Sequence, residues 1–102
     1  MSYVIKLTPV AQEDMKRLPP EAAIFVEAQL RLLAEYPTAL SRNSHFPYPP
    51  DMQLYEFDRD LDSENREFFH VLFKYGGDEG TIFIIGIARQ VSSFWWGKDE
   101  GR

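Results

Sequence analysis

The sequence of 102 residues has no cysteine, which excludes disulfide bonds, zinc–thiolate sites, iron–sulfur clusters and thiol nucleophiles. No stretch approaches the roughly 20 consecutive apolar residues that a membrane-spanning helix requires. Residues 1–6 lack the long apolar core of a signal peptide. The chain also has no internal repeat and no glycine-rich loop that could cradle a phosphate. We therefore expect a soluble cytoplasmic protein without a membrane partner.

The chain does have an ordinary globular composition, with 44% hydrophobic, 15% aromatic and 26% charged residues. Such a balance excludes wholesale disorder and, at this length, favours one domain with a single modest core. The formal net charge is −5, and residues 51–67 account for all of it, because they include seven acidic and two basic side chains. An acidic patch repels phosphate backbones and attracts basic partners, and the alternative is a solvated charged loop.

The N-terminal third predicts one strand and two helices. Residues 3–7 form a β-rich run, and the pair Thr8-Pro9 begins a helix, because threonine is a favoured N-cap and proline a favoured first helical residue. We expect this helix to end at Pro19 and a second helix to begin at Pro20. The second helix should end before Pro37, since the residue preceding a proline avoids the helical conformation. Its apolar stripe comprises Ala22, Val26, Leu30 and Leu33.

The rest of the chain alternates strand patterns with polar turns. Strands are predicted over residues 53–58, 68–75 and 81–88, and polar turns over residues 59–66 and 76–80. Residues 36–51 are predicted to form an irregular proline-rich segment. Residues 91–96 are predicted to form an edge strand or a tail, and residues 97–102 a flexible C-terminal tail. Helices followed by a run of strands indicate the α+β class. The predicted fold is a single domain of residues 1–96, with two N-terminal helices packed on one face of a mostly antiparallel four- to five-stranded sheet.

Three cationic or titratable side chains of this sheet are candidates for chemistry. His70 and Lys74 alternate with the run Phe69, Val71 and Phe73, so they lie on the other face of their strand. An imidazole suits proton transfer near neutral pH, and Arg89, which ends the last long strand, could clamp a phosphate. We expect these three side chains in one hollow on the face that the helices leave open. The alternatives are a half-buried sheet histidine and an arginine that caps a carbonyl or pairs with the acidic patch.

Two further regions carry candidate binding residues. Trp95, beside Trp96, could stack on a nucleobase or anchor a partner chain. Arg42 lies in the proline-rich segment together with His45 and Tyr48. Loops carry functional residues more often than strands do, although a solvated loop is the alternative here.

Several features of the sequence form one pattern. They are a strand that ends at Leu7-Thr8-Pro9, a helix that closes at Leu18-Pro19, the apolar stripe of the second helix, and strands over residues 69–75 and 81–87. This pattern resembles the RelE/ParE superfamily, the toxins of bacterial type II toxin–antitoxin modules, across residues 3–96. The resemblance implies a small α+β domain with two helices on a curved antiparallel sheet.

The resemblance also implies a function. The chain would be a toxin that cleaves mRNA in the ribosomal A site without a metal ion or other cofactor, and that thereby represses translation. His70 and Arg89 would be catalytic, and Arg42, Lys74 and Trp95 would bind RNA. The implied partners are a cognate antitoxin and, for the nuclease, the ribosome and mRNA, while a homodimer stays open.

The second hypothesis is a RelE/ParE-fold protein without catalysis, directed at gyrase or at another protein partner. Glu56 and Asp58 favour it, because they lie at strand positions where the family usually has lysine or arginine. Carboxylates there weaken phosphate binding. A third hypothesis assigns all these residues structural roles. The nuclease hypothesis predicts a contiguous positively charged cleft that contains Arg89, whereas the non-catalytic hypothesis predicts an exposed apolar patch around Trp95, Trp96 and Tyr48.

Overall fold

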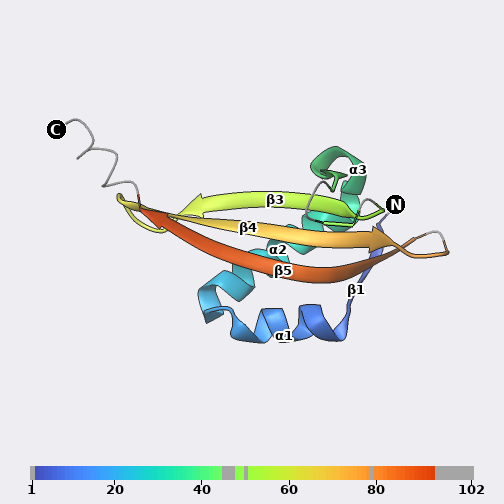
Figure 1. Cartoon of the computed structure of the whole chain (residues 1–102), viewed down its shortest axis with the longest axis horizontal. Coiled ribbons are helices and arrows are strands. Elements are labelled where there is room, and N and C mark those ends of the chain that lie inside the picture. The colour runs from blue at the N-terminus through green and yellow to red at the C-terminus, as the bar shows by residue number, and fades with distance from the viewer. Residues whose placement is uncertain (1, 45–47, 50, 79, 94–102) are drawn as a thin grey trace.

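The computed structural model describes residues 2–44, 48, 49, 51–78 and 80–93 (Figure 1). In this part of the chain, five strands form one sheet in the order β1-β5-β4-β3-β2. The bounds of the strands are Val4–Leu7 for β1, Arg42–Asn43 for β2, Gln53–Asp60 for β3, Asn65–Tyr75 for β4 and Thr81–Ser93 for β5. β1 pairs with β5 in parallel, and the other three pairings are antiparallel.

Prolines and the side chain of Thr8 determine where the helices begin. α1 (Pro9–Arg17) begins where the Thr8 hydroxyl accepts a hydrogen bond from the backbone N–H of Ala11. α2 (Pro20–Glu35) follows after only two residues, Leu18 and Pro19, and the short α3 (Pro37–Leu40) follows after Tyr36. Each helix has proline in its first turn, where the missing N–H costs no hydrogen bond.

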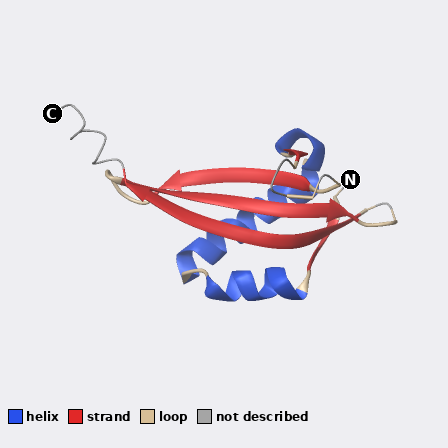
Figure 2. Ribbon diagram, viewed as in Figure 1, coloured by secondary structure: helices blue, strands red, loops and turns tan. Residues whose placement is uncertain are grey.

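α1 and α2 lie on the same side of the three long strands (Figure 2), and we call this side of the sheet the helix-side face. The predicted stripe of α2 is buried there against aromatic and aliphatic side chains of the sheet. The sheet residues of this core are Tyr55, Phe69, Val71, Phe73, Ile82, Ile84 and Ile87. The opposite side, which carries His70 and is not covered by a helix in the described ranges, is the open face.

A β-bulge in β5 connects the sheet to α1. The register between β4 and β5 skips Ile85, so this residue is the extra one. The Thr8 hydroxyl donates to the carbonyl of Ile84 at 2.8 Å, and the Asp14 carboxylate accepts from the backbone N–H of Ile87 at 2.9 Å. The bulge therefore lies between two side-chain contacts from the α1 region.

The structure confirms the predicted α+β class, with two helices on one face of a mostly antiparallel sheet. It corrects three boundaries. Residues 59–66 are not one long turn, because β3 continues to Asp60 and β4 begins at Asn65. Arg89 does not end its strand, since β5 continues to Ser93. The segment 36–51, predicted to be irregular, contains α3 and β2, because its residues hydrogen-bond to α2 and β3.

Candidate functional site

The open face is hollowed on both sides of His70. The larger hollow has a volume of about 250 Å³, and the smaller one, of about 140 Å³, is mostly apolar. The larger hollow is lined by Glu56, Phe57, Asp58, Phe68, Phe69 and His70. The smaller is lined by Tyr48, Leu54, His70, Leu72, Gly86 and Ala88. His70 is thus the one residue of the described ranges that both hollows share.

The β3–β4 register brings a carboxylate to His70. Glu56 lies directly opposite His70 in the antiparallel pair, and such residues point to the same face. The Nδ1 atom of His70 lies 2.9 Å from Oε2 of Glu56, although it has no hydrogen-bond partner of suitable alignment among the described residues. Arg42, from β2, donates to the other carboxylate oxygen of Glu56. The three side chains form a cation–carboxylate–imidazole row across three strands.

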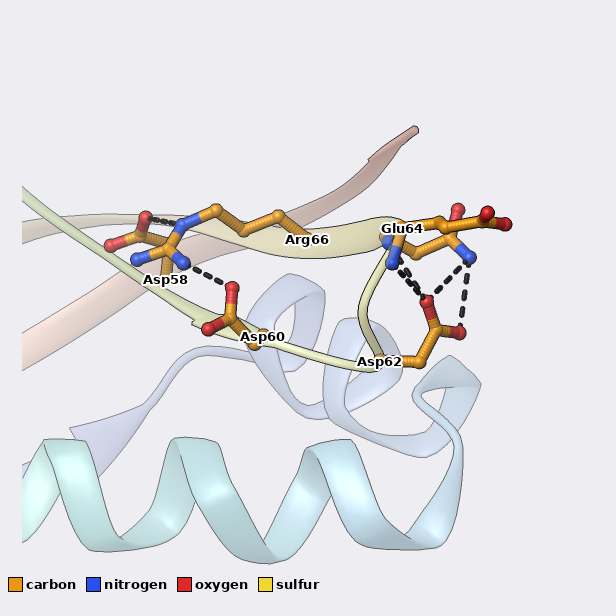
Figure 3. A network of polar contacts seen from close by, with 6 residues as sticks. Asp58, Asp60, Asp62, Glu64 and Arg66 are labelled. Atoms are coloured by element: carbon orange, nitrogen blue, oxygen red, sulfur yellow. Dashed lines mark hydrogen bonds and ion pairs between the residues drawn. The ribbon is translucent and has the colours of Figure 1, made fainter. Parts of the chain in front are cut away.

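The same face carries more carboxylates toward the far end of β3. Arg66 of β4 donates to both Asp58 and Asp60 (Figure 3), and its hydrogen bond to Asp58 raises the pKa of its guanidinium. In the adjoining turn, the Asp62 carboxylate accepts from the backbone N–H groups of Glu64 and Asn65. These bonds, the one from Glu64 first, lower the pKa of Asp62. The predicted acidic patch is therefore largely an ordered network.

Arg89 lies on the helix-side face. It pairs with Phe69, a core residue of that face, and its Nε donates to the buried carboxylate of Glu67. Arg59 donates to the second oxygen of Glu67 at 2.6 Å and lies over the ring of Phe25 in α2, with 4.6 Å from its Cζ to the ring centroid. Burial alone would raise the pKa of Glu67, but the hydrogen bonds from Arg89 and Arg59 outweigh it and lower this pKa.

The prediction that His70, Lys74 and Arg89 share one hollow is therefore wrong. The predicted positively charged cleft that contains Arg89 is wrong as well, because Arg89 lies on the helix-side face and the carboxylates of β3 outnumber the arginines on the open face. His70 and Lys74 are on the open face, where Lys74 lies 3.7 Å from Asp51, and Arg89 is on the other face. Arg42 is near His70 through Glu56. Trp95 lies outside the described residues.

Sequence reasoning also missed two carboxylates. The sequence analysis notes Glu56 as a carboxylate at a strand position, but it does not identify Glu56 as the partner of His70. Pairing strand 53–58 with strand 68–75 as a hairpin places the two residues opposite each other. The sequence pattern counts Glu67 in the acidic patch of residues 51–67, whereas in the structure this side chain is 1% exposed and holds two arginines. Gly86 was a signal for the bulge that reverses the face of Arg89, because an isolated glycine inside a strand often marks one.

No cluster of three or more histidine, aspartate or glutamate side chains that could hold a metal ion exists among the described residues. Of the helices in the described ranges, none has the length and apolar character needed to span a bilayer. The open-face row of Arg42, Glu56 and His70 is the group best placed for proton transfer, since it joins a titratable imidazole to a carboxylate beside a hollow.

No protein-family model and no curated protein matches the chain. Among solved structures, it is similar to a chain of the RelBE2 toxin–antitoxin complex of Mycobacterium tuberculosis, with a TM-score of 0.64, 15% identity, and coverage of 88% of this chain and 100% of that chain. It is also similar to a mutant of the E. coli toxin RelE in the free state (TM-score 0.59, 16% identity, 86% and 83% coverage). A chain of the intact E. coli RelBE complex gives a TM-score of 0.57, 16% identity, and 85% and 95% coverage. The chain therefore has the fold of the RelE toxins, as its sequence pattern predicted.

Proposed function

We propose that this chain is the toxin component of a type II toxin–antitoxin module and that it cleaves RNA, without a metal ion, on the open face of its sheet. The observation that carries this proposal is the 2.9 Å contact between His70 and Glu56 beside the larger hollow. A cognate antitoxin belongs to the same proposal, because two of the similar structures are toxin–antitoxin complexes.

Metal-independent RNA cleavage places clear demands on the site. The ribose 2′-oxygen forms a bond to the adjacent phosphorus, and the bond from phosphorus to the 5′-oxygen breaks. A base must take the proton of the 2′-hydroxyl, a cation must stabilise the charge on the phosphate, and the 5′-oxygen must gain a proton. Because the ribosome binds mRNA in the proposed reaction, the protein needs to supply only the groups at the reacting nucleotide.

The open-face row supplies the first two groups. In this proposal the imidazole of His70 takes the 2′ proton, and the Glu56 carboxylate orients it and stabilises the imidazolium that forms. Arg42 has a side chain that is 57% exposed and so can reach a phosphate beside Glu56. Water supplies the proton for the 5′-oxygen. The apolar hollow on the other side of His70, with Leu54 and Leu72 in its lining, suits the flat apolar surface of a nucleobase.

The charge on this face predicts an unusual salt dependence for such a nuclease. The three β3 carboxylates Glu56, Asp58 and Asp60 are opposed by Arg42 and Arg66, so two positive charges meet three negative ones. Few phosphates can be neutralised by free cations here, and affinity for RNA should change little with salt. Positioning by the ribosome would then replace charge attraction.

A non-catalytic toxin is the second candidate, and the same ion pairs favour it. Arg66 is already bonded to two aspartates, Arg42 is bonded to Glu56, and Lys74 lies near Asp51. Each of these cations would have to leave a carboxylate to hold a phosphate. A polar, ion-paired surface beside an apolar hollow is typical of an interface with another protein. In that case the open face binds gyrase or another protein target.

A cell-free translation reaction with one defined mRNA separates the two candidates. We expect the wild-type protein to stop translation and cut the mRNA, and His70→Ala and Glu56→Gln to slow cleavage by about 100-fold, the usual contribution of a general base. Asp60→Asn is the matched control, because Asp60 is on the same strand and face and also bonds to an arginine, but lines neither hollow.

The outcomes are distinct. Cleavage by His70→Ala at the wild-type rate would contradict the assigned base. Intact mRNA together with inhibition of gyrase or another isolated protein target would support the non-catalytic candidate. Normal translation, intact mRNA and normal growth of expressing cells would contradict the toxin proposal itself.

A further inference from the structure

We propose that Arg59 and Arg89 form a binding site for a carboxylate side chain of a protein partner, on the face of the sheet opposite to the candidate nuclease site. The partner assigned to it is the cognate antitoxin, and this identity rests on the proposed toxin function. The carboxylate site itself is argued from the geometry of the two arginines.

The two guanidinium groups are held by one buried anion. Glu67 is 1% exposed, and each of its oxygens accepts a hydrogen bond from the Nε atom of one arginine. Within the described residues, the terminal nitrogens of Arg59 and Arg89 donate no hydrogen bond. Those nitrogens are the ends of the fork that binds carboxylates through two parallel hydrogen bonds.

The site is also positively charged, accessible and rigid. Two guanidinium groups and one carboxylate leave a net charge of +1, and the side chains of Arg59 and Arg89 are 29% and 30% exposed. Glu67 fixes both arginines, and the ring of Phe25 supports Arg59 from below. An incoming carboxylate therefore meets donors that are already ordered, which lowers the entropy cost of binding.

The surroundings favour a protein segment over RNA. Val91 lies opposite Glu67 in the register and so on the same face, and it is 42% exposed. Leu61, two residues beyond Arg59 in the sequence, is also 42% exposed. Arginine beside exposed aliphatic side chains is typical of protein interfaces. RNA held through its bases would use an available aromatic ring for stacking, but Arg59 already covers the ring of Phe25 beside it.

The first experiment tests the carboxylate site without any partner. The arginine side-chain NMR signals of the full chain are followed while glutarate, and in a separate series inorganic phosphate, is added at constant ionic strength. We expect saturable shifts for Arg59 and Arg89 with glutarate, and none for Arg66, which is held by two aspartates on the open face. Equal responses from all three arginines would overturn the site. A response to phosphate alone would assign it to a nucleic-acid backbone and overturn the protein partner.

The second experiment tests the partner. The protein encoded beside this gene is co-expressed with the chain, and the dissociation constant of the complex is measured for wild type, Arg59→Lys/Arg89→Lys and the matched control Arg66→Lys. The double variant keeps the positive charges but loses the planar guanidinium groups that can make two parallel hydrogen bonds to a carboxylate. We therefore expect it to bind at least about tenfold more weakly, while the control binds as wild type. Circular dichroism verifies that each variant is folded.

Failure of this inference and failure of the proposed function give different results. A neighbouring protein that binds wild type and the double variant equally would overturn the inference and leave the toxin proposal intact. A neighbouring protein that does not bind wild type at all would contradict the toxin–antitoxin proposal, and the glutarate titration would still decide whether the carboxylate site exists.

Discussion

His70 and Arg89 point to opposite faces of the sheet, although they are only one step apart in the β4–β5 register. Arg89 pairs with Phe69 of the core, whereas His70 pairs with Ala88. A single substrate phosphate cannot contact both side chains directly. The base at His70 must therefore work with groups of its own face, and Glu56 is the group in contact with it.

This arrangement predicts different effects for two substitutions. In the translation reaction, His70→Ala should lower the rate of mRNA cleavage by about 100-fold, while Arg89→Ala should leave it within about threefold once loss of folded protein is corrected for. The ratio of the two rates is the measurement. An Arg89→Ala variant that is fully folded but as inactive as His70→Ala would contradict separate faces for the two roles.

The bulge explains why sequence reasoning placed Arg89 wrongly. Strict alternation from the buried residues Ile82 and Ile84 puts Arg89 on the open face with His70. The extra residue Ile85 shifts the alternation by one, so Ile87 and then Arg89 face the helices. A one-residue shift exchanges the two faces of a strand, and only the pairing with β4 and the contact from α1 determine where it occurs.

Asp14 is predicted to stabilise that bulge. Its carboxylate accepts from the partly buried N–H of Ile87, and Asp14→Ala should cost about 1–2 kcal/mol of unfolding free energy, because this donor is left unpaired. Urea denaturation gives the value. The control is Glu13→Ala, which removes only an exposed pair with Lys16 and should cost about 0.5 kcal/mol or less. Equal losses in both variants would assign the effect to helix α1 rather than to the bulge.

Local chemistry made the helices predictable, and long-range pairing made part of the sheet unpredictable. The Thr8 cap and the prolines at 9, 20 and 37 act within a few residues, so their effect could be recognised in the sequence. The ends of β3 and β4 depend instead on cross-strand bonds such as Arg66 with Asp60. The same holds for Glu67, whose carboxylate is bonded by arginines of the two neighbouring strands, Arg59 of β3 and Arg89 of β5.

The turn between β4 and β5 offers a matched pair of glycines. Gly80 has a φ of 102°, a conformation that costs an L-residue roughly 1 kcal/mol. Gly77 has no neighbouring atom within 4 Å of an added Cβ. Gly80→Ala should therefore lower the melting temperature by about 4–8 °C, whereas Gly77→Ala should leave it unchanged or raise it slightly. A larger loss at Gly77 would contradict the turn geometry.

The last prediction concerns the pH dependence of stability. The pKa of Glu67 is lower in the folded state, where Arg89 and Arg59 bond to its carboxylate, than the value of about 4.3 for a solvated glutamate. Below that value the unfolded chain binds the proton more readily, so this contribution to stability is present above about pH 4.3 and is lost as the pH falls through the folded-state pKa.

Glu67→Gln should therefore cost about 2 kcal/mol at pH 7, because it removes a buried anion from two arginines, and its deficit relative to wild type should shrink steadily between pH 5 and pH 3. Urea unfolding of both proteins across that range measures the difference. Glu64→Gln makes the same chemical change at an exposed turn position and should cost little at pH 7. A Glu67→Gln deficit that stays constant down to pH 3 would mean that the carboxylate stabilises the fold by its shape and not by its charge.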